Sequence, residues 1–268
     1  MWHKPHLLNV LADLLFAAGA AAILAAGVLA AARLPLFPLH QVVLLERLQS
    51  VRPDELEGAL AGSGLLRGNF FNVNLEAVRG ALEKLPWVRK AEVRRRWPGK
   101  LEVRLEEHQA AARWGAEPGQ MVNTYGEVFA TGATAPVPGE EGEARGLALA
   151  RLPMLYGPAG SSAEVLRRYV DTQAALKPIA RRPVELTLSP RLAWHLKLDD
   201  GMVVELGREQ AKAPVAARLA RFVTYYPGTL AVRTPRLDVV DMRYPNGFAL
   251  RVMGTGNAGT KPDGKEKK

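Results

Sequence analysis

The sequence contains no cysteine, and its five histidines are scattered along 268 residues. The lack of thiols excludes disulfide-stapled scaffolds, thiol catalysis and every zinc or iron–sulfur site that is built on cysteine. The histidines form no HExxH pattern, and no compact group of carboxylates accompanies them in the sequence. We therefore expect no metal site. The absence of cysteine does not identify the compartment.

Catalytic and nucleotide-binding motifs are also missing from the sequence. There is no G-x-S-x-G nucleophile elbow and no G-x-x-x-x-G-K-[ST] phosphate loop. Residues 254–259 read GTGNAG and fit G-x-G-x-x-G, but only a short, lysine-rich end follows them. A dinucleotide fingerprint needs a helix at that point to face the pyrophosphate. We expect no catalytic residue and no cofactor.

One long apolar run lies near the start of the chain. Residues 14–32, LLFAAGAAAILAAGVLAAA, carry no charge. As a helix, at about 1.5 Å per residue, this segment would span one bilayer core. We expect an uncleaved anchor, because the run is longer than the apolar region of a signal peptide; a cleaved signal is the alternative. The flanking charges nearly balance, so the residues alone do not set the orientation.

The segment after the anchor predicts the order strand, helix, helix, strand, strand. Pro53 suits the first turn of one helix, and Asn74 can cap the next. Leu101, Val103 and Leu105 alternate with charged residues, as in a half-buried strand. The expected elements are a strand at 41–48, a helix from 53 to about 62, a helix at 75–85, a strand at 88–97 and a strand at 101–105.

A second unit, rich in strands, is predicted over the rest of the chain. Residues 134–146, rich in proline, glycine and glutamate, predict a loop, and residues 254–268 predict a disordered tail with nothing to bury. Helices are expected at 162–176 and 209–225, and Pro214 can interrupt or delay the second. Strands are expected at 109–114, at 121–129 with a bend around Tyr125-Gly126, and at 184–188, 192–198 and 202–206. A final hairpin is expected at 237–243 and 248–252, around Pro245-Asn246-Gly247.

Short motifs follow one another in order behind the apolar run. They read LPWV at 85–88, VRRRWP at 93–98, ARW at 112–114, LPMLYGP at 152–158 and VDMRYPNG at 240–247. Together they resemble the signatures of the FtsQ/DivIB family of cell-division proteins over about residues 10–253. Two positions depart from the family pattern. Asn123 stands where the family usually has Asp, and Pro245 removes a backbone donor close to the final strand.

The resemblance implies an α+β fold in three parts: an N-terminal transmembrane helix, a POTRA domain of order β-α-α-β-β, and a second mixed β-rich domain with flanking helices. It also implies a cytoplasmic N-terminus and a periplasmic bulk, held in the inner membrane at the division septum. The boundaries that we expect are 1–13 for the cytoplasmic N-terminus, 14–32 for the transmembrane helix, 37–107 for the POTRA domain, 108–253 for the β-rich FtsQ-type domain and 254–268 for the tail.

The function that the resemblance implies is a non-enzymatic scaffold of the division machinery. In FtsQ-like proteins the distal domain docks FtsB, itself paired with FtsL, and the POTRA domain contacts upstream division proteins. A terminal strand at a sheet edge can pair with an incoming strand, and a nearby arginine can bind a carboxylate. From the residues alone, a hairpin that merely closes the sheet is the alternative. The partner-binding residues that we expect are Arg191, Arg243, Tyr244, Asn246, Gly247 and Phe248.

Two rival functions stay open from the sequence: another POTRA-bearing membrane-anchored assembly or transport factor, and a membrane-anchored periplasmic hydrolase. The basic residues between Arg89 and Arg104 are interleaved with glutamates. We expect cross-strand ion pairs there, with contact to anionic lipid as a second interpretation. No nucleic-acid partner is expected.

Overall fold

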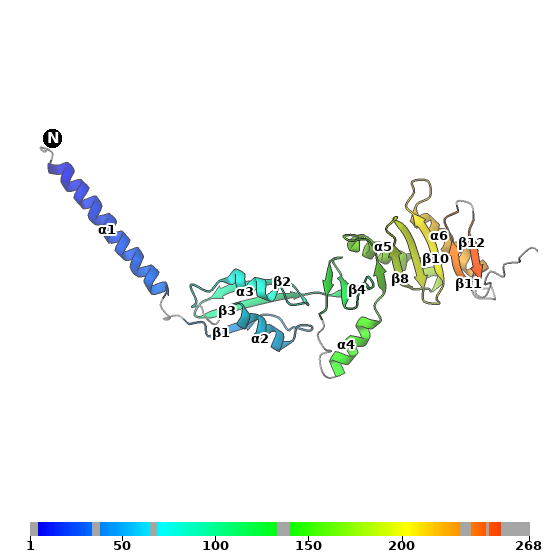
Figure 1. The fold of residues 1–268 in the computed structure, drawn as a ribbon, viewed down its shortest axis with the longest axis horizontal. Coiled ribbons are helices and arrows are strands. Elements are labelled where there is room, and N and C mark those ends of the chain that lie inside the picture. The colour runs from blue at the N-terminus through cyan, green and yellow to red at the C-terminus, as the bar shows by residue number, and fades with distance from the viewer. Residues whose placement is uncertain are drawn as a thin grey trace, which may run out of the picture. The chain divides into compact units, whose positions relative to one another are not determined.

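The structure, a computed structural model, describes residues 5–33, 38–64, 69–132, 140–230, 237–244 and 247–252 (Figure 1). The chain divides into two compact units, Met1–His108 and Gln109–Lys268. The fold is α+β, as predicted: an N-terminal apolar helix, a small β-α-α-β-β unit and a β-rich unit with helices. The expected tail at 254–268 lies outside the described residues.

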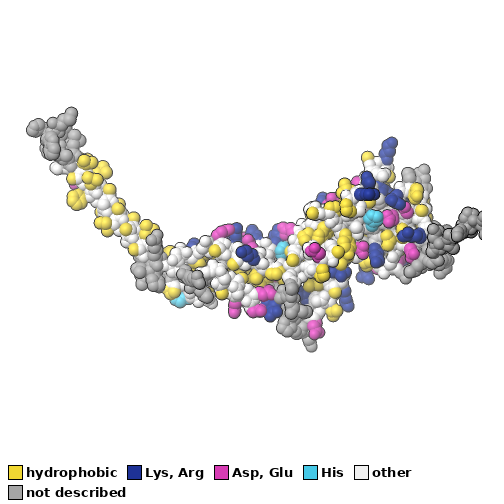
Figure 2. Space-filling view, viewed as in Figure 1, with side chains coloured by type: hydrophobic (Ala, Val, Ile, Leu, Met, Phe, Trp, Pro, Cys, Tyr) yellow, Lys and Arg dark blue, Asp and Glu magenta, His cyan; other side chains and the backbone are white. Residues whose placement is uncertain are grey.

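The first helix, α1 (Pro5–Arg33), is long and apolar on every side. Its segment Asn9–Ala30 has a mean hydropathy of 2.0, and none of the apolar window is buried. Figure 2 shows hydrophobic side chains along the part of the helix whose side chains the structure describes. A helix that is apolar all round needs an apolar environment, and 22 residues are enough to cross a bilayer. This helix is therefore suited to a protein that spans a membrane once.

The small unit contains a three-stranded sheet of order β1-β3-β2. Strand β1 runs parallel to β3, and β2 runs antiparallel to β3. The elements are β1 (Gln41–Leu44), α2 (Pro53–Gly62), α3 (Leu75–Leu82), β2 (Val88–Arg96) and β3 (Lys100–Glu107). The order predicted from the sequence is confirmed. The side chain of Asn74 caps α3, as predicted, by accepting a hydrogen bond from the N–H of Ala77 at 3.1 Å.

Strand β1 ends earlier than the sequence predicted, at Leu44 instead of position 48. Leu45 still donates to the carbonyl of Val103 at 3.1 Å, and further along the chain the carboxylate of Glu107 takes over as the acceptor. It accepts hydrogen bonds from the backbone N–H groups of Gln49, Ser50 and Val51 at 2.7–2.9 Å. These donors are satisfied by a side chain instead of a neighbouring strand, so the chain turns away from the sheet before α2.

The core of the small unit lies between its sheet and α3. Leu101, Val103 and Leu105 are buried on one face of β3, which confirms the predicted alternation. Val78 and Leu82 of α3, which packs on β2 of the same sheet, are fully buried. Cross-strand ion pairs, as expected from the interleaved glutamates, join β2 to β3: Arg89 with Glu106 and Arg96 with Glu102. The other pairs do not cross between these strands: Lys90 and Arg94 pair with Glu92 of their own strand, and Arg104 pairs with Glu46, which lies beyond the end of β1.

The larger unit is a nine-stranded sheet of order β12-β11-β10-β9-β8-β7-β4-β5-β6. Its strands are β4 (Ala110–Trp114), β5 (Gln120–Asn123), β6 (Val128–Ala130), β7 (Met154–Tyr156), β8 (Pro183–Leu188), β9 (Ala193–Leu198), β10 (Val203–Arg208), β11 (Leu237–Asp241) and β12 (Ala249–Val252). Its helices are α4 (Glu140–Ala150), α5 (Ser162–Leu176), with a 3-10 turn at Lys177–Ile179, and α6 (Val215–Tyr225), with a π turn at Tyr226–Leu230.

The segment expected as one strand at 121–129, bent around Tyr125-Gly126, is two strands, β5 and β6, with a turn at that bend. Asn123 closes the turn, because its side-chain oxygen accepts hydrogen bonds from the N–H groups of Tyr125 and Glu127. Helix α6 begins at Val215 and not at position 209, which agrees with the delay predicted at Pro214. One expected element was wrong. The loop expected at 134–146 gives way to α4 from Glu140 onward. Its glutamates, alanines and leucines favour a helix strongly enough to tolerate two glycines.

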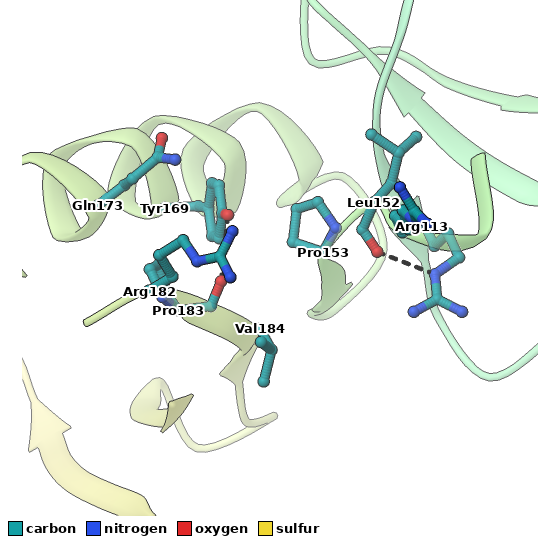
Figure 3. A pocket seen from close by; sticks show the side chains of 9 residues that line it. Arg113, Leu152, Pro153, Tyr169, Gln173, Arg182, Pro183 and Val184 are labelled. Atoms are coloured by element: carbon teal, nitrogen blue, oxygen red, sulfur yellow. Dashed lines mark hydrogen bonds between the residues drawn. The ribbon is translucent and has the colours of Figure 1, made fainter. Parts of the chain in front are cut away.

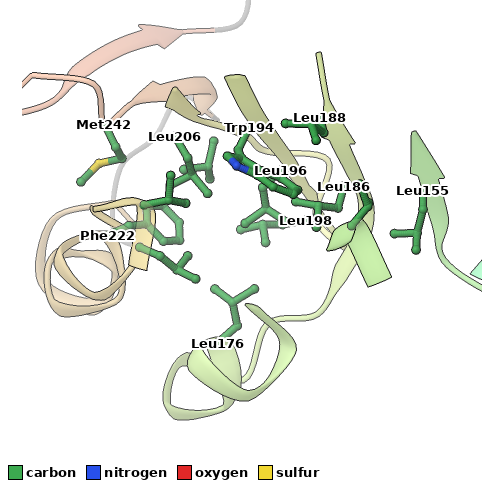
Figure 4. Packing of buried hydrophobic residues seen from close by; sticks show 14 of the residues in the cluster. Leu155, Leu176, Leu186, Leu188, Trp194, Leu196, Leu198, Leu206, Phe222 and Met242 are labelled. Atoms are coloured by element: carbon green, nitrogen blue, oxygen red, sulfur yellow. The ribbon is translucent and has the colours of Figure 1, made fainter. Parts of the chain in front are cut away.

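The core of the larger unit lies where α5 packs on β7 and β8 and α6 packs on β10. Figure 4 shows leucines from the strands directed toward Leu176 of α5 and Phe222 of α6. All the buried hydrophobic residues of these elements belong to one cluster, which reaches Val240 and Met242 at the end of β11. The rigid core therefore extends to the last hairpin, β11–β12, which the sequence predicted correctly.

Candidate functional site

Strand β12 forms one edge of the nine-stranded sheet. It pairs antiparallel with β11, with Val240 opposite Leu250 and Asp241 opposite Ala249, and no described strand pairs with its other side. Strand β11 in turn runs parallel to β10. An edge strand offers backbone N–H and C=O groups to an incoming strand. The hairpin therefore agrees with both interpretations of the sequence: it completes the sheet on this side, and its outer strand is an edge at which a partner strand can pair.

An ion pair lies directly after β11. The guanidinium of Arg243 holds the carboxylate of Asp241, with its Nη2 2.6 Å from Oδ2 and its Nε 2.9 Å from Oδ1. The backbone N–H of Arg243 also donates to Oδ1 at 3.0 Å. The side-chain hydrogen bond to Arg243 lowers the pKa of Asp241, although partial burial works against this. The same contact raises the pKa of Arg243.

Arg221 of α6 holds the chain beyond β11 in place. Its Nη2 donates to the carbonyl of Met242 at 3.0 Å and to the carbonyl of Tyr244 at 2.7 Å. Met242 is fully buried, whereas the side chain of Tyr244 is 56% exposed. The segment is thus anchored through its backbone, which leaves the tyrosine ring at the surface. Sequence reasoning missed Arg221 because the contact joins residues more than twenty positions apart.

The close approach of Arg243 depends on a glycine in β10. Gly207 has φ +72°, a conformation that favours glycine, and a Cβ at this position would lie 2.9 Å from Cγ of Arg243. Beneath the same strand, Arg218 is 3% exposed and donates to the backbone carbonyls of Leu206, Arg208 and Ala213. Burial lowers the pKa of Arg218. These carbonyl contacts make Arg218 a structural support for β10.

Phe248 faces partly into the domain. Its ring lies 5.7 Å from that of Tyr225, centroid to centroid, and it packs against the hydrophobic core together with Leu250. Only part of its surface can therefore face a partner. Gly247 is described next to it, and Asn246 lies outside the described residues.

Arg191 lies in the turn between β8 and β9, with its side chain exposed. The turn adjoins Ala193, which pairs with Arg208 at the end of β10, and the parallel strand β11 ends on the same side. Arg191 and Arg243 therefore lie at the same end of the sheet. Arg208 is exposed between them, a further cation that the sequence did not single out.

A separate cleft of about 580 Å³ lies beside α5 and the start of β8 (Figure 3). It is lined by three arginines, Arg113, Arg151 and Arg182, and by Tyr169 among others. Arg113 donates to the carbonyl of Leu152, and the Tyr169 hydroxyl donates to the carbonyl of Pro183 at 3.2 Å. Burial raises the pKa of Tyr169. The described lining residues offer charge for an anion but no carboxylate or histidine that could act as a base.

Two family models match the chain. Residues 37–108 match the POTRA domain, FtsQ-type, and residues 112–243 match the C-terminal domain of the cell division protein FtsQ/DivIB. The second match ends at Arg243, so strand β12 lies beyond it.

Curated proteins named "Cell division protein FtsQ" are similar over almost the whole chain. The protein of Burkholderia pseudomallei is 37% identical over 254 residues, which cover 95% of each chain. That of Bordetella pertussis is 36% identical over 93% of this chain and 92% of its own. That of Nitrosospira multiformis is 34% identical over 94% of this chain and 99% of its own.

Proposed function

The chain belongs to the FtsQ/DivIB family of cell-division proteins, and from this premise we propose that it is a non-enzymatic scaffold of the divisome that binds the FtsB/FtsL coiled-coil pair. Membership of the family supports a role in cell division. The partners, and the surface that binds them, are our proposal. The scaffold would link proteins that reach the septum early to those that arrive late.

The observation that carries this proposal is the edge of β12 beside the exposed ring of Tyr244. A segment of the partner would add to the sheet along β12, and its backbone would pair with the outer side of that strand. Tyr244 would contribute aromatic area to the contact. Arg191, Arg208 and Arg243 at the same end of the sheet would attract acidic residues of the partner.

We further propose how the chain is placed in the cell. Residues 1–13 would be cytoplasmic, residues 14–32 would cross the inner membrane, and the rest would lie in the periplasm. The POTRA domain, 37–107, would contact upstream division proteins, and the domain at 108–253 would bind FtsB and FtsL. The apolar helix supports a single span. Because the chain lacks cysteine, a single cysteine introduced in place of exposed Arg191 can report its side of the membrane through an impermeant maleimide.

Capture of the FtsB/FtsL pair by the purified full chain tests the docking surface. Tyr244→Ala should weaken capture by about 2 kcal/mol or more if the ring is a hot spot. The matched control is Tyr125→Ala, which removes a tyrosine that is 62% exposed in the turn between β5 and β6. The control should bind as wild type does, and neither change should lower the melting temperature. Wild-type capture by Tyr244→Ala would contradict the proposed surface.

A further inference from the structure

Three aromatic rings gather at one end of the small unit. Phe70, Phe71 and Trp97 have centroids 5.3–6.5 Å apart. Phe70 is buried beneath the other two, whereas Trp97 is 62% exposed and Phe71 is 47% exposed. Large aromatic side chains exposed together on a small domain indicate a contact surface. We call Phe71 and Trp97 the aromatic tip.

The aromatic tip is held in place by an arginine. Arg95 of β2 donates to the carbonyls of Phe70 at 2.8 Å and Val73 at 2.7 Å. The side-chain oxygen of Asn69 accepts hydrogen bonds from the N–H groups of Phe71 and Asn72. The backbone that presents Phe71 is therefore fixed, and the ring is presented without a large loss of conformational freedom on binding.

The aromatic tip lies at the end of the unit where the chain arrives from α1. Pro38 forms a β-bridge with Asn69, next to Phe70, and the N–H of His40 donates to the carbonyl of Gly99, next to the turn at Trp97. Helix α1 ends at Arg33. Pro38 is five residues after Arg33, and five residues can span at most about 18 Å, whatever path the chain takes. The intervening sequence, LPLF at 34–37, is itself apolar.

The charge around the aromatic tip is positive. Arg94, Arg95, Arg96 and Lys100 lie at the adjoining ends of β2 and β3. Two acids offset part of this charge: Glu92 pairs with Arg94, and Glu102 pairs with Arg96. Tryptophan beside lysine and arginine is the composition found where proteins meet the headgroup region of a bilayer. Cations close to a membrane surface also attract anionic lipid.

We propose that the aromatic tip inserts into the headgroup region of the same bilayer that α1 spans, and so fixes the orientation of the POTRA unit relative to the membrane. The aromatic tip binds the lipid surface and not another protein, because the short segment between α1 and Pro38 keeps the tip close to the membrane. The proposal holds for either orientation of the chain in the membrane. It is independent of the docking edge at β12, which lies in the other unit.

Site-directed labelling tests this contact, because the chain has no cysteine of its own. Arg96→Cys places a fluorophore next to Trp97, and Lys90→Cys places one on the same strand and the same face, farther from the tip. Both native side chains are well exposed, at 65% and 59%. The full-length protein is reconstituted at one chain per nanodisc of phosphatidylethanolamine and phosphatidylglycerol. Collisional quenching by aqueous iodide is then measured at each probe.

The proposal predicts several-fold weaker quenching at position 96 than at position 90, and equal quenching at both sites in the Trp97→Ala background. Equal quenching in the wild-type background would overturn it. So would protection that persists after Trp97→Ala, or protection that arises only when two chains share a nanodisc and therefore reflects a second copy. The comparison of the two probes in the wild-type background needs no core substitution, so it does not depend on how the alanine variant folds.

Discussion

Arg243 donates to the carboxylate of Asp241, two residues earlier in the chain, through both Nε and Nη2. The cation expected to meet an acidic partner is therefore already engaged by an acid of its own domain. Charge reversal at position 243 would set two carboxylates side by side and disturb the fold as well as the partner contact. Replacement by glutamine, which keeps the side-chain shape without the charge, is the cleaner change.

The Asp241–Arg243 contact should make the stability of the distal unit depend on pH. The pKa of Asp241 is lowered in the folded state from its ordinary value of 3.8. A carboxyl with a lowered pKa contributes stability above its unfolded pKa, and this contribution is lost as the pH falls through the folded value. Wild type should therefore melt at a higher temperature than Arg243→Gln at neutral pH.

The difference in melting temperature should shrink only below about pH 4, in the range where Asp241 becomes protonated. Arg191→Gln, which removes an exposed arginine from the same end of the sheet, is the matched control and should show little difference at any pH. A difference between wild type and Arg243→Gln that stays constant down to pH 3 would mean that the carboxylate does not stabilise the fold through this pair.

Trp87→Ala should destabilise the POTRA unit by about 3–5 kcal/mol, because truncation of a buried aromatic ring leaves a cavity. The ring is 8% exposed. Amide hydrogen exchange in β2 and β3 of the full chain measures the effect on this unit alone. Trp97→Ala removes the same side chain from a surface position and is the control. Comparable exchange rates in the two variants would show that Trp87 does not stabilise the core.

Ile23→Arg should impair membrane insertion by about 2.5–3.5 kcal/mol, the cost of an arginine at the centre of a spanning helix. Ile23 lies within the apolar segment Asn9–Ala30. Because the segment is rich in alanine, it has little excess hydrophobicity to offset the cost of inserting an arginine. Extraction of membranes with carbonate reports the loss, and Ile23→Leu serves as the control. If the arginine variant stays wholly in the membrane fraction, α1 is not the anchor.

Much of the fold could be predicted because local patterns agree with the tertiary structure. The alternation of Leu101, Val103 and Leu105 predicted the buried face of β3. The turn residues at 245–247, between two apolar runs, predicted the last hairpin. The helix α4 was missed, since its glycines and glutamates resemble a loop and its identity depends on helix propensity summed over the segment.

The site was less predictable than the fold, because its contacts join distant parts of the chain. The aromatic and basic residues near position 244 could be found from the sequence. Two features of the site depend on the parallel pairing of β10 with β11. One is the pair of hydrogen bonds from Arg221 to the carbonyls of Met242 and Tyr244. The other is the position of Arg208 between Arg191 and Arg243. A crossover through α6 brings these strands together, and no local pattern encodes that register.

The measurement that tests the central claim most directly is amide hydrogen exchange of the full chain with and without the FtsB/FtsL pair. If the partner adds a strand, exchange should slow in β12, Ala249–Val252, where new backbone hydrogen bonds form. Strand β6, Val128–Ala130, is the other edge of the same sheet and should be unaffected. Binding that protects β6, or that leaves β12 unprotected, would contradict the account.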